Sequence, residues 1–340
     1  METHTKQTQT PNPPIRLNST PPGPWAATDK DKADLFANYL LDVFTPHDQE
    51  LDQAVESELA KPVHSTARLP AFTLQNLQQE IIKLKKRKAP GLDNITSQML
   101  KEIPKEGLIK LLHIYNAVVR CNYWPADFKS AQIIMALKPG KDPTDVTSYR
   151  PISLLSTISK ILEKLISRQI SIDTELNTWV PHHQFGFRKT HSTIQQCHRI
   201  THTVNTALEY KQYCTAAFLD ISQAFDKVWH PGLLCKIKRL LPLGYFPLLK
   251  SYLQDRTYVT KVNTATSNMH HIQSGVPQGS ILGPLLYTLY TSDLPTSKHT
   301  EISTFTDDTA IVAVDQNPNT ASQNFKTISP AWGIGYANGW

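Results

Sequence analysis

Residues 302–314 read ISTFTDDTAIVAV, and this stretch consists of two runs rich in β-branched residues on either side of Asp307 and Asp308. Such runs favour β-strands, and a short polar break between two of them is typical of a hairpin. The sequence therefore predicts strands over residues 302–306 and 309–314, joined by a tight turn that carries two carboxylates at its tip.

A third carboxylate, Asp220, ends another strand-like run. Residues 216–221 read AAFLDI and are followed by SQAFD, which is typical of the start of a helix. A strand end and a hairpin tip can meet at one edge of a sheet, where their carboxylates would offer oxygen ligands to divalent ions. Three carboxylates at one place repel one another unless a cation lies between them. For either segment alone, the simpler interpretation is a helix N-cap at Asp220 and ordinary turn residues at Asp307 and Asp308.

The rest of the chain mixes helical and strand-like patterns. Apolar residues recur at helical spacing from Leu35 to Phe44, behind a potential N-cap at Thr28, and this helix is expected to end before Pro46. Further helices are predicted over 74–86, 95–103, 106–120 and 155–171, and further strands over 130–137, 214–221 and 258–263. Because strands and helices do not alternate as regularly as in a parallel doubly wound sheet, the predicted fold class is α+β.

The helix predicted over 155–171 is amphipathic. Its apolar residues fall on one stripe, and its charged residues lie on the other side. Glu163 is therefore expected to face away from the core together with Lys160, Lys164 and Arg168.

Composition limits the classes of protein to which the chain can belong. It has 340 residues, of which 40% are hydrophobic, enough for one large or two ordinary domains with a core. A formal charge of +6 and a pI near 9.0 suit a polyanionic partner such as nucleic acid, although many basic proteins share them. The four cysteines lie far apart, which favours reduced thiols. The polar N-terminus and the short apolar run at 281–290 predict neither secretion nor membrane anchorage.

Three longer segments carry a specific resemblance. They are FLDISQAFDKVW at 218–229, SGVPQGSILGPLLYTLY at 274–290 and TFTDDTAIV at 304–312. In this order they resemble palm motifs A, B and C of reverse transcriptases from non-LTR retrotransposons of the LINE-like and jockey-like kind. Upstream segments that resemble the same family are DLFANYLLDVFTPHD at 34–48, KKRKAPGLDNIT at 85–96, LKPGKDPTDVTSYRPISLLSTISKILEKLI at 137–166 and HQFGFRKTHST at 183–193.

This resemblance implies the fingers and palm of a right-hand polymerase. The predicted organisation is a disordered or linker segment at 1–27, a helical lead-in at 28–72, a fingers-like region at 73–210, a palm-like region with motifs A, B and C at 211–327, and an atypical tail at 328–340. Motif D and the thumb would follow motif C in the family. The chain is therefore predicted to be truncated after motif C, with the thumb absent.

Reverse transcriptases of this kind add deoxynucleotides to a primer 3′-hydroxyl, so the resemblance implies an RNA template, a DNA primer and dNTPs as partners. It also implies two Mg²⁺ ions, with Mn²⁺ as a substitute, because two metal ions suit in-line phosphoryl transfer. Asp220 and Asp307 match the family's principal metal ligands, and Asp308 would help to set the charge and geometry of the site. The implied location is the nucleus or cytoplasm, in a retroelement ribonucleoprotein.

Other positions match the family's nucleotide site. Phe225 matches the aromatic residue that excludes a ribose 2′-hydroxyl, with an ordinary core aromatic as the alternative. Gln278, followed by Gly279, matches the motif B glutamine beside the incoming nucleotide. Lys138 and Arg150 match the fingers cations that bind the triphosphate, whereas either alone is more often a solvated surface cation.

Two basic segments are expected to contact nucleic acid. Arg188 and Lys189 follow aromatic residues and are predicted to bind the template backbone. The other segment contains Lys85, Lys86, Arg87 and Lys88. It could bind template phosphates or act as a nuclear localisation patch, with the solvated end of a helix as the alternative.

Three other functions stay open. Because Thr306 stands where the family has Ala, and because the tail departs from the family, the chain could be an inactive remnant that acts at most as a nucleic-acid-binding module. An RNA-templated RNA polymerase shares the palm carboxylates but is disfavoured by Phe225. A group II intron maturase shares the fold but is disfavoured by the jockey-like flanking segments.

Overall fold

The computed structural model describes residues 13–18, 22–46, 53–63, 68–173, 180–188, 190–294, 296–324 and 326. Its helices are α1 (Asp29–Val43), α2 (Gln53–Ala60), α3 (Leu74–Ile82), α4 (Ser97–Lys101), α5 (Lys105–Cys121), α6 (Ala126–Lys129), the 3-10 helix η1 (Val146–Ser148), α7 (Thr157–Asp173), α8 (Thr193–Glu209), α9 (His230–Leu240), α10 (Tyr245–Leu253) and α11 (Gly283–Tyr290). Its strands are β1 (Ser130–Leu137), β2 (Tyr149–Leu155), β3 (Tyr213–Leu219), β4 (Arg256–Val262), β5 (Ala265–Thr266), β6 (His270–Ile272), β7 (Thr300–Phe305) and β8 (Asp308–Asp315). This mixture of elements agrees with the predicted α+β class. Within these residues no helix is both long and apolar enough to cross a lipid bilayer.

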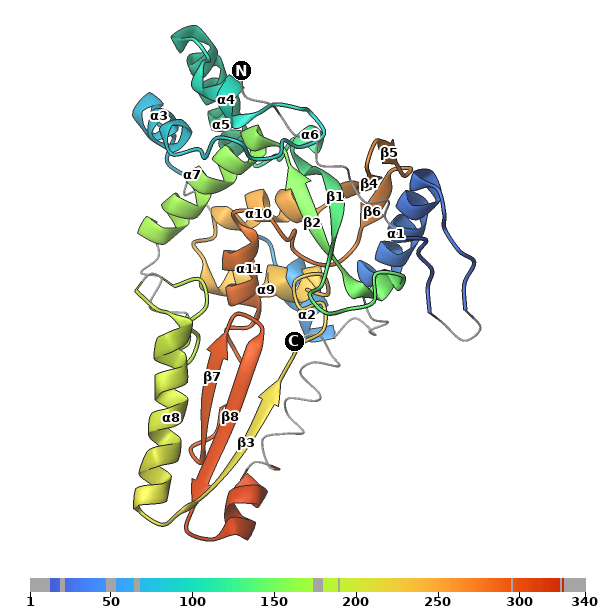
Figure 1. Ribbon diagram of the computed structural model, residues 1–340. Coiled ribbons are helices and arrows are strands. Elements are labelled where there is room, and N and C mark those ends of the chain that lie inside the picture. Colours follow the sequence, from blue (N-terminus) through green and yellow to red (C-terminus); the bar gives the residue numbers. More distant parts are fainter. Residues whose placement is uncertain are drawn as a thin grey trace, which may run out of the picture.

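The strands form two sheets (Figure 1). In the larger sheet the order is β2-β1-β4-β5, with β6 also paired to β4, and β1 runs antiparallel to β2 but parallel to β4. The smaller sheet has the order β3-β8-β7, and both of its pairs are antiparallel. Helix α8 runs along this smaller sheet and contacts all three of its strands (Figure 1).

The predicted hairpin is present, and its two-residue turn lies one residue earlier in the chain than expected. Phe305 pairs with Asp308, so the turn consists of Thr306 and Asp307 alone. Asp308 is therefore the first residue of β8 and does not lie at the tip. Thr306 has a φ of 65°, a left-handed conformation that is unusual for a β-branched residue.

Most of the core is built from helices. The largest apolar cluster joins buried side chains of α3, α5, α7, α9, α10 and α11. The apolar stripe of α7 is buried in this cluster, as its periodicity predicts. Glu163, on the same helix, was expected to face away from the core, but it is fully buried. Its carboxylate is buried because it accepts hydrogen bonds from the backbone amides of Ile281 and Leu282, at the start of α11.

Helix α3 is shorter than predicted. It ends at Ile82 rather than near residue 86, and Arg87 has a φ of 62°, which a right-handed helix does not allow. Residues 83–88 are mostly cationic, so they gain little from packing on the core in helical form. The basic segment consequently lies in the loop between α3 and α4.

Part of the predicted N-terminal linker is folded. Ile15 is only 2% exposed, pairs with Ala26 and packs against Phe36 and Val146. Ile15 thus helps to hold the segment on the body of the protein, together with the backbone hydrogen bonds of Arg16 to Thr144 and Val146. Residues 1–12 and 19–21 lie outside the described residues. Thr28 caps α1 as predicted, in a capping box with Asp31.

Candidate active site

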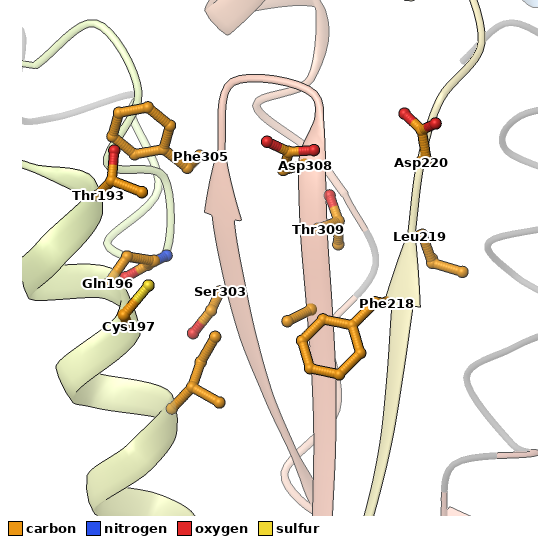
Figure 2. A pocket seen from close by; sticks show the side chains of 12 residues that line it. Thr193, Gln196, Cys197, Phe218, Leu219, Asp220, Ser303, Phe305, Asp308 and Thr309 are labelled. Atoms are coloured by element: carbon orange, nitrogen blue, oxygen red, sulfur yellow. The ribbon is translucent and has the colours of Figure 1, made fainter. Parts of the chain in front are cut away.

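The carboxylates predicted to form the site lie at one end of the smaller sheet. Leu219 pairs with Thr309, so Asp220 follows the last paired residue of β3 while Asp308 precedes its partner on β8. Figure 2 shows the side chains of Asp220 and Asp308 on these neighbouring strands, at the same end of the sheet. Asp307 occupies the adjacent turn. The antiparallel register of β3 and β8 therefore brings together the two segments that the sequence singled out.

The charges of Asp220 and Asp308 affect the pKa of Asp307. The pKa of Asp307 is raised, first because the side chain is partly buried and then because Asp308 and Asp220 carry like charges nearby. The guanidinium of Arg150 acts in the opposite direction. Asp307 thus lies close enough to Asp220, Asp308 and Arg150 for their charges to act on its carboxyl.

Within the described part of the chain, the protein side chains do not form a complete metal site by themselves. Among the residues that the structure describes, no three His, Cys, Asp or Glu side chains are placed so that they could jointly hold a metal ion. Mg²⁺ is commonly bound by one or two carboxylates together with substrate phosphates and water. The arrangement of Asp220, Asp307 and Asp308 fits an ion of that kind, which the protein and its substrate would hold between them.

A pocket of about 300 Å³ lies between α8 and the smaller sheet (Figure 2). Asp220 and Asp308 stand at its rim, and its walls are largely apolar, with Ile200, Phe218 and Ala310 among the lining residues. Phe218 is 75% exposed although it belongs to a strand. The carboxylates therefore border an open, mostly apolar space.

The two cations predicted to bind triphosphate lie at one end of the β1–β2 hairpin. Arg150 is on β2 opposite Ala136, and Lys138 comes directly after β1. The Lys138 ammonium donates to the carbonyl of Thr147 at 3.0 Å. The charge of Lys138 opposes the burial that raises the pKa of Asp226, and the charge of Arg150 likewise opposes the rise in the pKa of Asp307. The larger sheet thus presents positive charge to the acidic end of the smaller sheet.

Phe225 is partly buried between aromatic neighbours. Its ring stacks on Tyr287 with 4.4 Å between centroids and an interplanar angle of 15°. The ring of Phe187 meets it edge-on at 6.0 Å. These contacts fix the plane of the Phe225 ring, although the ring also packs against the helical core. The packing is compatible with both the nucleotide-site prediction and the core-aromatic alternative.

The loop predicted to lie beside the nucleotide is attached to two other segments. The side-chain amide of Gln278 donates to the carboxylate of Asp226 at 2.7 Å. The backbone carbonyl of Gln278 accepts from the backbone amide of Ser153. Gly279 has a φ of 116°, and a Cβ there would lie 2.6 Å from the Ser153 carbonyl oxygen. Only glycine allows the loop to approach β2 so closely.

Asp226 has the most perturbed carboxyl among these residues. Burial raises its pKa to about 7, although the hydrogen bond from Gln278 and the charges of Lys227 and Lys138 act against this rise. Its role had no mechanistic assignment from the sequence. The structure shows that it joins the segment after Asp220 to the loop that carries Gln278.

The residues predicted to bind nucleic acid differ in their exposure to solvent and in their hydrogen bonds. Arg188 donates to the carbonyls of Pro181 and Gln184, so its guanidinium is at least partly engaged within its own loop. Lys189 lies outside the described residues. The other basic segment is exposed throughout, and its members are Lys85, Lys86, Arg87 and Lys88.

The burial of three polar residues near the site was not predicted from the sequence. Gln184, Gln196 and Glu163 are all almost completely buried and all bond to backbone groups at or near the predicted motifs. Gln and Glu are normally surface residues, so their identity gave no indication of burial. The one available signal was the position of Gln184 within the segment HQFGFRKTHST, where only the basic residues had been considered.

The sequence of the chain matches a known protein family. Residues 137–331 match the family described as reverse transcriptase (RNA-dependent DNA polymerase). The matched range begins at the end of β1 and includes the segments that carry all three carboxylates.

Most of the chain is also similar to polymerases of insect mobile elements. It is 42% identical to the RNA-directed DNA polymerase from mobile element jockey of Drosophila melanogaster, over 86% of this chain and 33% of that protein. It is 38% identical to the probable RNA-directed DNA polymerase from transposon BS of Drosophila melanogaster, over 94% of this chain and 36% of that protein. It is 40% identical to the probable RNA-directed DNA polymerase from transposon X-element of the same organism, over 85% of this chain and 33% of that protein. The chain thus spans about a third of the length of these relatives.

Proposed function

The chain belongs to the reverse transcriptase (RNA-dependent DNA polymerase) family, and from this membership we propose that it extends a primer with deoxynucleotides on an RNA template, in a jockey-like non-LTR retrotransposon. The observation that carries the proposal is the meeting of Asp220, Asp307 and Asp308 at one end of the smaller sheet. Family membership alone would be compatible with an inactive relative, whereas carboxylates that lie together at one end of the sheet favour phosphoryl transfer by this chain.

In this proposal Asp220 and Asp307 bind Mg²⁺, and Asp308 contributes negative charge beside them. Two such ions would activate the primer 3′-hydroxyl and neutralise the departing pyrophosphate. The raised pKa of Asp307 is consistent with the assignment: burial is its main cause, and the like charges of Asp308 and Asp220 add to it. The carboxylates themselves fix where the ions can sit and so where the primer end must lie.

The nucleotide is held between the two sheets in this proposal. Lys138 and Arg150 bind its triphosphate, and their electrostatic reach to Asp226 and Asp307 supports this placement. Phe225 lies under the sugar and excludes a 2′-hydroxyl, a role that its fixed ring plane suits. Residues 73–210 then correspond to the fingers and residues 211–327 to the palm.

Primer extension on poly(rA)/oligo(dT) with dTTP and Mg²⁺ tests the proposal directly. We expect incorporation by the unmodified chain, and a fall of at least about a hundredfold for Asp307→Asn, because the metal ligand is lost. Asp315→Asn is the matched control, since Asp315 lies at the far end of β8, the strand that follows Asp307. Its incorporation rate should stay close to that of the unmodified chain.

Two results would contradict the proposal. If the chain binds RNA but incorporates no dNTP, it acts as a nucleic-acid-binding module and not as a polymerase. If it incorporates rNTPs in preference to dNTPs, the chain is an RNA polymerase and the role assigned to Phe225 is wrong.

A further inference from the structure

The turn that carries Asp307 is held in an unfavourable conformation. It contains only Thr306 and Asp307, and Thr306 has a φ of 65°. A β-branched side chain rarely adopts this conformation, because its Cβ lies too close to the following carbonyl. Such a conformation persists only when neighbouring groups fix it. Groups that surround the turn must therefore hold Thr306 in this conformation.

The side chain of Gln184 meets the turn with both ends of its amide. Its Nε2 donates to the carbonyl of Thr306 at 3.2 Å, and its Oε1 accepts from the amide of Thr306 at 3.1 Å. The same Oε1 accepts from the amide of Gly186 at 2.7 Å. Gln184 is only 3% exposed, so these bonds form away from competing water.

Neighbouring backbone holds Gln184 itself in place. The segment 183–186 lies beside β7 like a short additional strand, since the amide of Phe185 donates to Thr304 and the amide of Thr304 donates to His183. A Cβ on Gly186 would lie 2.3 Å from the Thr306 nitrogen. The chain therefore passes directly against the turn, and glycine is needed for that approach.

We propose that Gln184 is a positioning residue, which fixes the backbone of Thr306 so that Asp307 keeps the geometry that its role as a metal ligand requires. The inference rests on the proposed function, because it assigns Gln184 to the same site. Gln184 touches neither substrate nor metal in this account. Its side-chain amide bonds to both backbone groups of Thr306, which lies in the turn beyond the last paired residues of β7 and β8.

The test compares Gln184→Met with Gln196→Met. Both residues are buried glutamines in the same region. Gln196 donates to the carbonyls of His183 and Thr304, so it helps to hold segment 183–186 beside β7, whereas Gln184 is the one of the two that bonds to Thr306 in the turn. We expect Gln184→Met to lower kcat by about 10- to 100-fold with the KM for dNTP changed less than about threefold, as a small displacement of a reacting group would. Gln196→Met should lower kcat far less at a similar loss of thermal stability.

Hydrogen exchange gives a readout that needs no activity. In the unmodified chain the Thr306 amide is bonded to Gln184, so it should exchange about tenfold more slowly than in Gln184→Met. Gln196→Met should leave the exchange of Thr306 close to that of the unmodified chain. Adding Thr306→Gly to Gln184→Met should restore most of the lost kcat, because glycine adopts a positive φ without strain.

Either of two results overturns the inference. One is unchanged exchange of Thr306 in Gln184→Met, and the other is an equal loss of kcat in the two Met variants at equal stability. An unmodified chain that is inactive but has a protected Thr306 amide would contradict the proposed function and support the contact between Gln184 and the turn.

Discussion

Asp226 shows how one buried side chain can make stability depend on pH. Burial raises the pKa of its carboxyl from about 3.8 to about 7. The folded chain therefore holds this proton more tightly than the unfolded chain, in which the carboxyl ionises near its ordinary pKa. Between about pH 4 and pH 7 the folded state loses stability as the pH rises, and above that range this contribution is constant.

Asp226→Asn should remove this dependence. An amide carries no charge at any of these pH values, so the variant should gain about 2–4 kcal/mol relative to the unmodified chain when the pH changes from 5 to 8. Urea denaturation at both pH values measures the difference. Asp127→Asn makes the same chemical change at an exposed position and should leave the pH profile as it is. Equal profiles for Asp226→Asn and the unmodified chain would show that Asp226 is ionised without cost in the fold.

Among the elements, α11 is notable because a carboxylate from another helix occupies its start. Oε2 of Glu163, on α7, accepts from the amides of Ile281 and Leu282 at 2.6 and 3.1 Å. Amides at the start of a helix have no partner within the helix, and they carry the positive end of its dipole. Glu163 thereby anchors α11, and with it the loop of Gln278 and Gly279 directly upstream.

Glu163→Ala should therefore destabilise the chain by about 1–3 kcal/mol, because two buried amides lose their acceptor. Glu163→Gln is the matched control: its side-chain oxygen can still accept from the same amides, so it should cost clearly less. The free energy of unfolding in urea separates the two variants. Similar values for Ala and Gln would mean that the two hydrogen bonds contribute little.

At the scale of the whole molecule, positive charge is concentrated away from the core. The net charge is +6, and the segment containing Lys85 and Lys86 is fully exposed in the loop after α3. Exposed cations that contact phosphates make the binding of nucleic acid depend on salt, because each contact releases a counterion. The slope of the logarithm of the RNA association constant against the logarithm of the salt concentration therefore reports the number of such contacts.

If this loop binds template, the double variant Lys85→Ala, Lys86→Ala should reduce that slope by up to about 1.4 for single-stranded RNA. Lys105→Ala, Lys110→Ala removes the same charge from exposed positions on α5 and serves as the control. Fluorescence anisotropy with labelled RNA at several salt concentrations measures both. Equal slopes for the two double variants would show that the loop contributes only through net charge.

The sequence by itself determined the elements whose pattern is local. Two runs rich in β-branched residues predicted the hairpin over 302–314, and the strand predicted over 130–137 coincides with β1. The spacing of apolar residues predicted α1 and its cap at Thr28. Three ordered motifs were enough to indicate the family, which the match over residues 137–331 confirms.

Only the tertiary structure decided which polar residues are buried and what they hold. Gln184 bonds to a residue 122 positions away, and Glu163 bonds to amides 118 and 119 positions away. Local periodicity carries no information about partners so distant, and by periodicity Glu163 belonged to the polar side of its helix. The two-residue turn depended equally on register, because the pairing of Phe305 with Asp308 separates Asp307 in the turn from Asp308 in the strand. Side-chain burial and strand register are properties of the packed molecule, so they could be assigned only once the sheets and helices were in place.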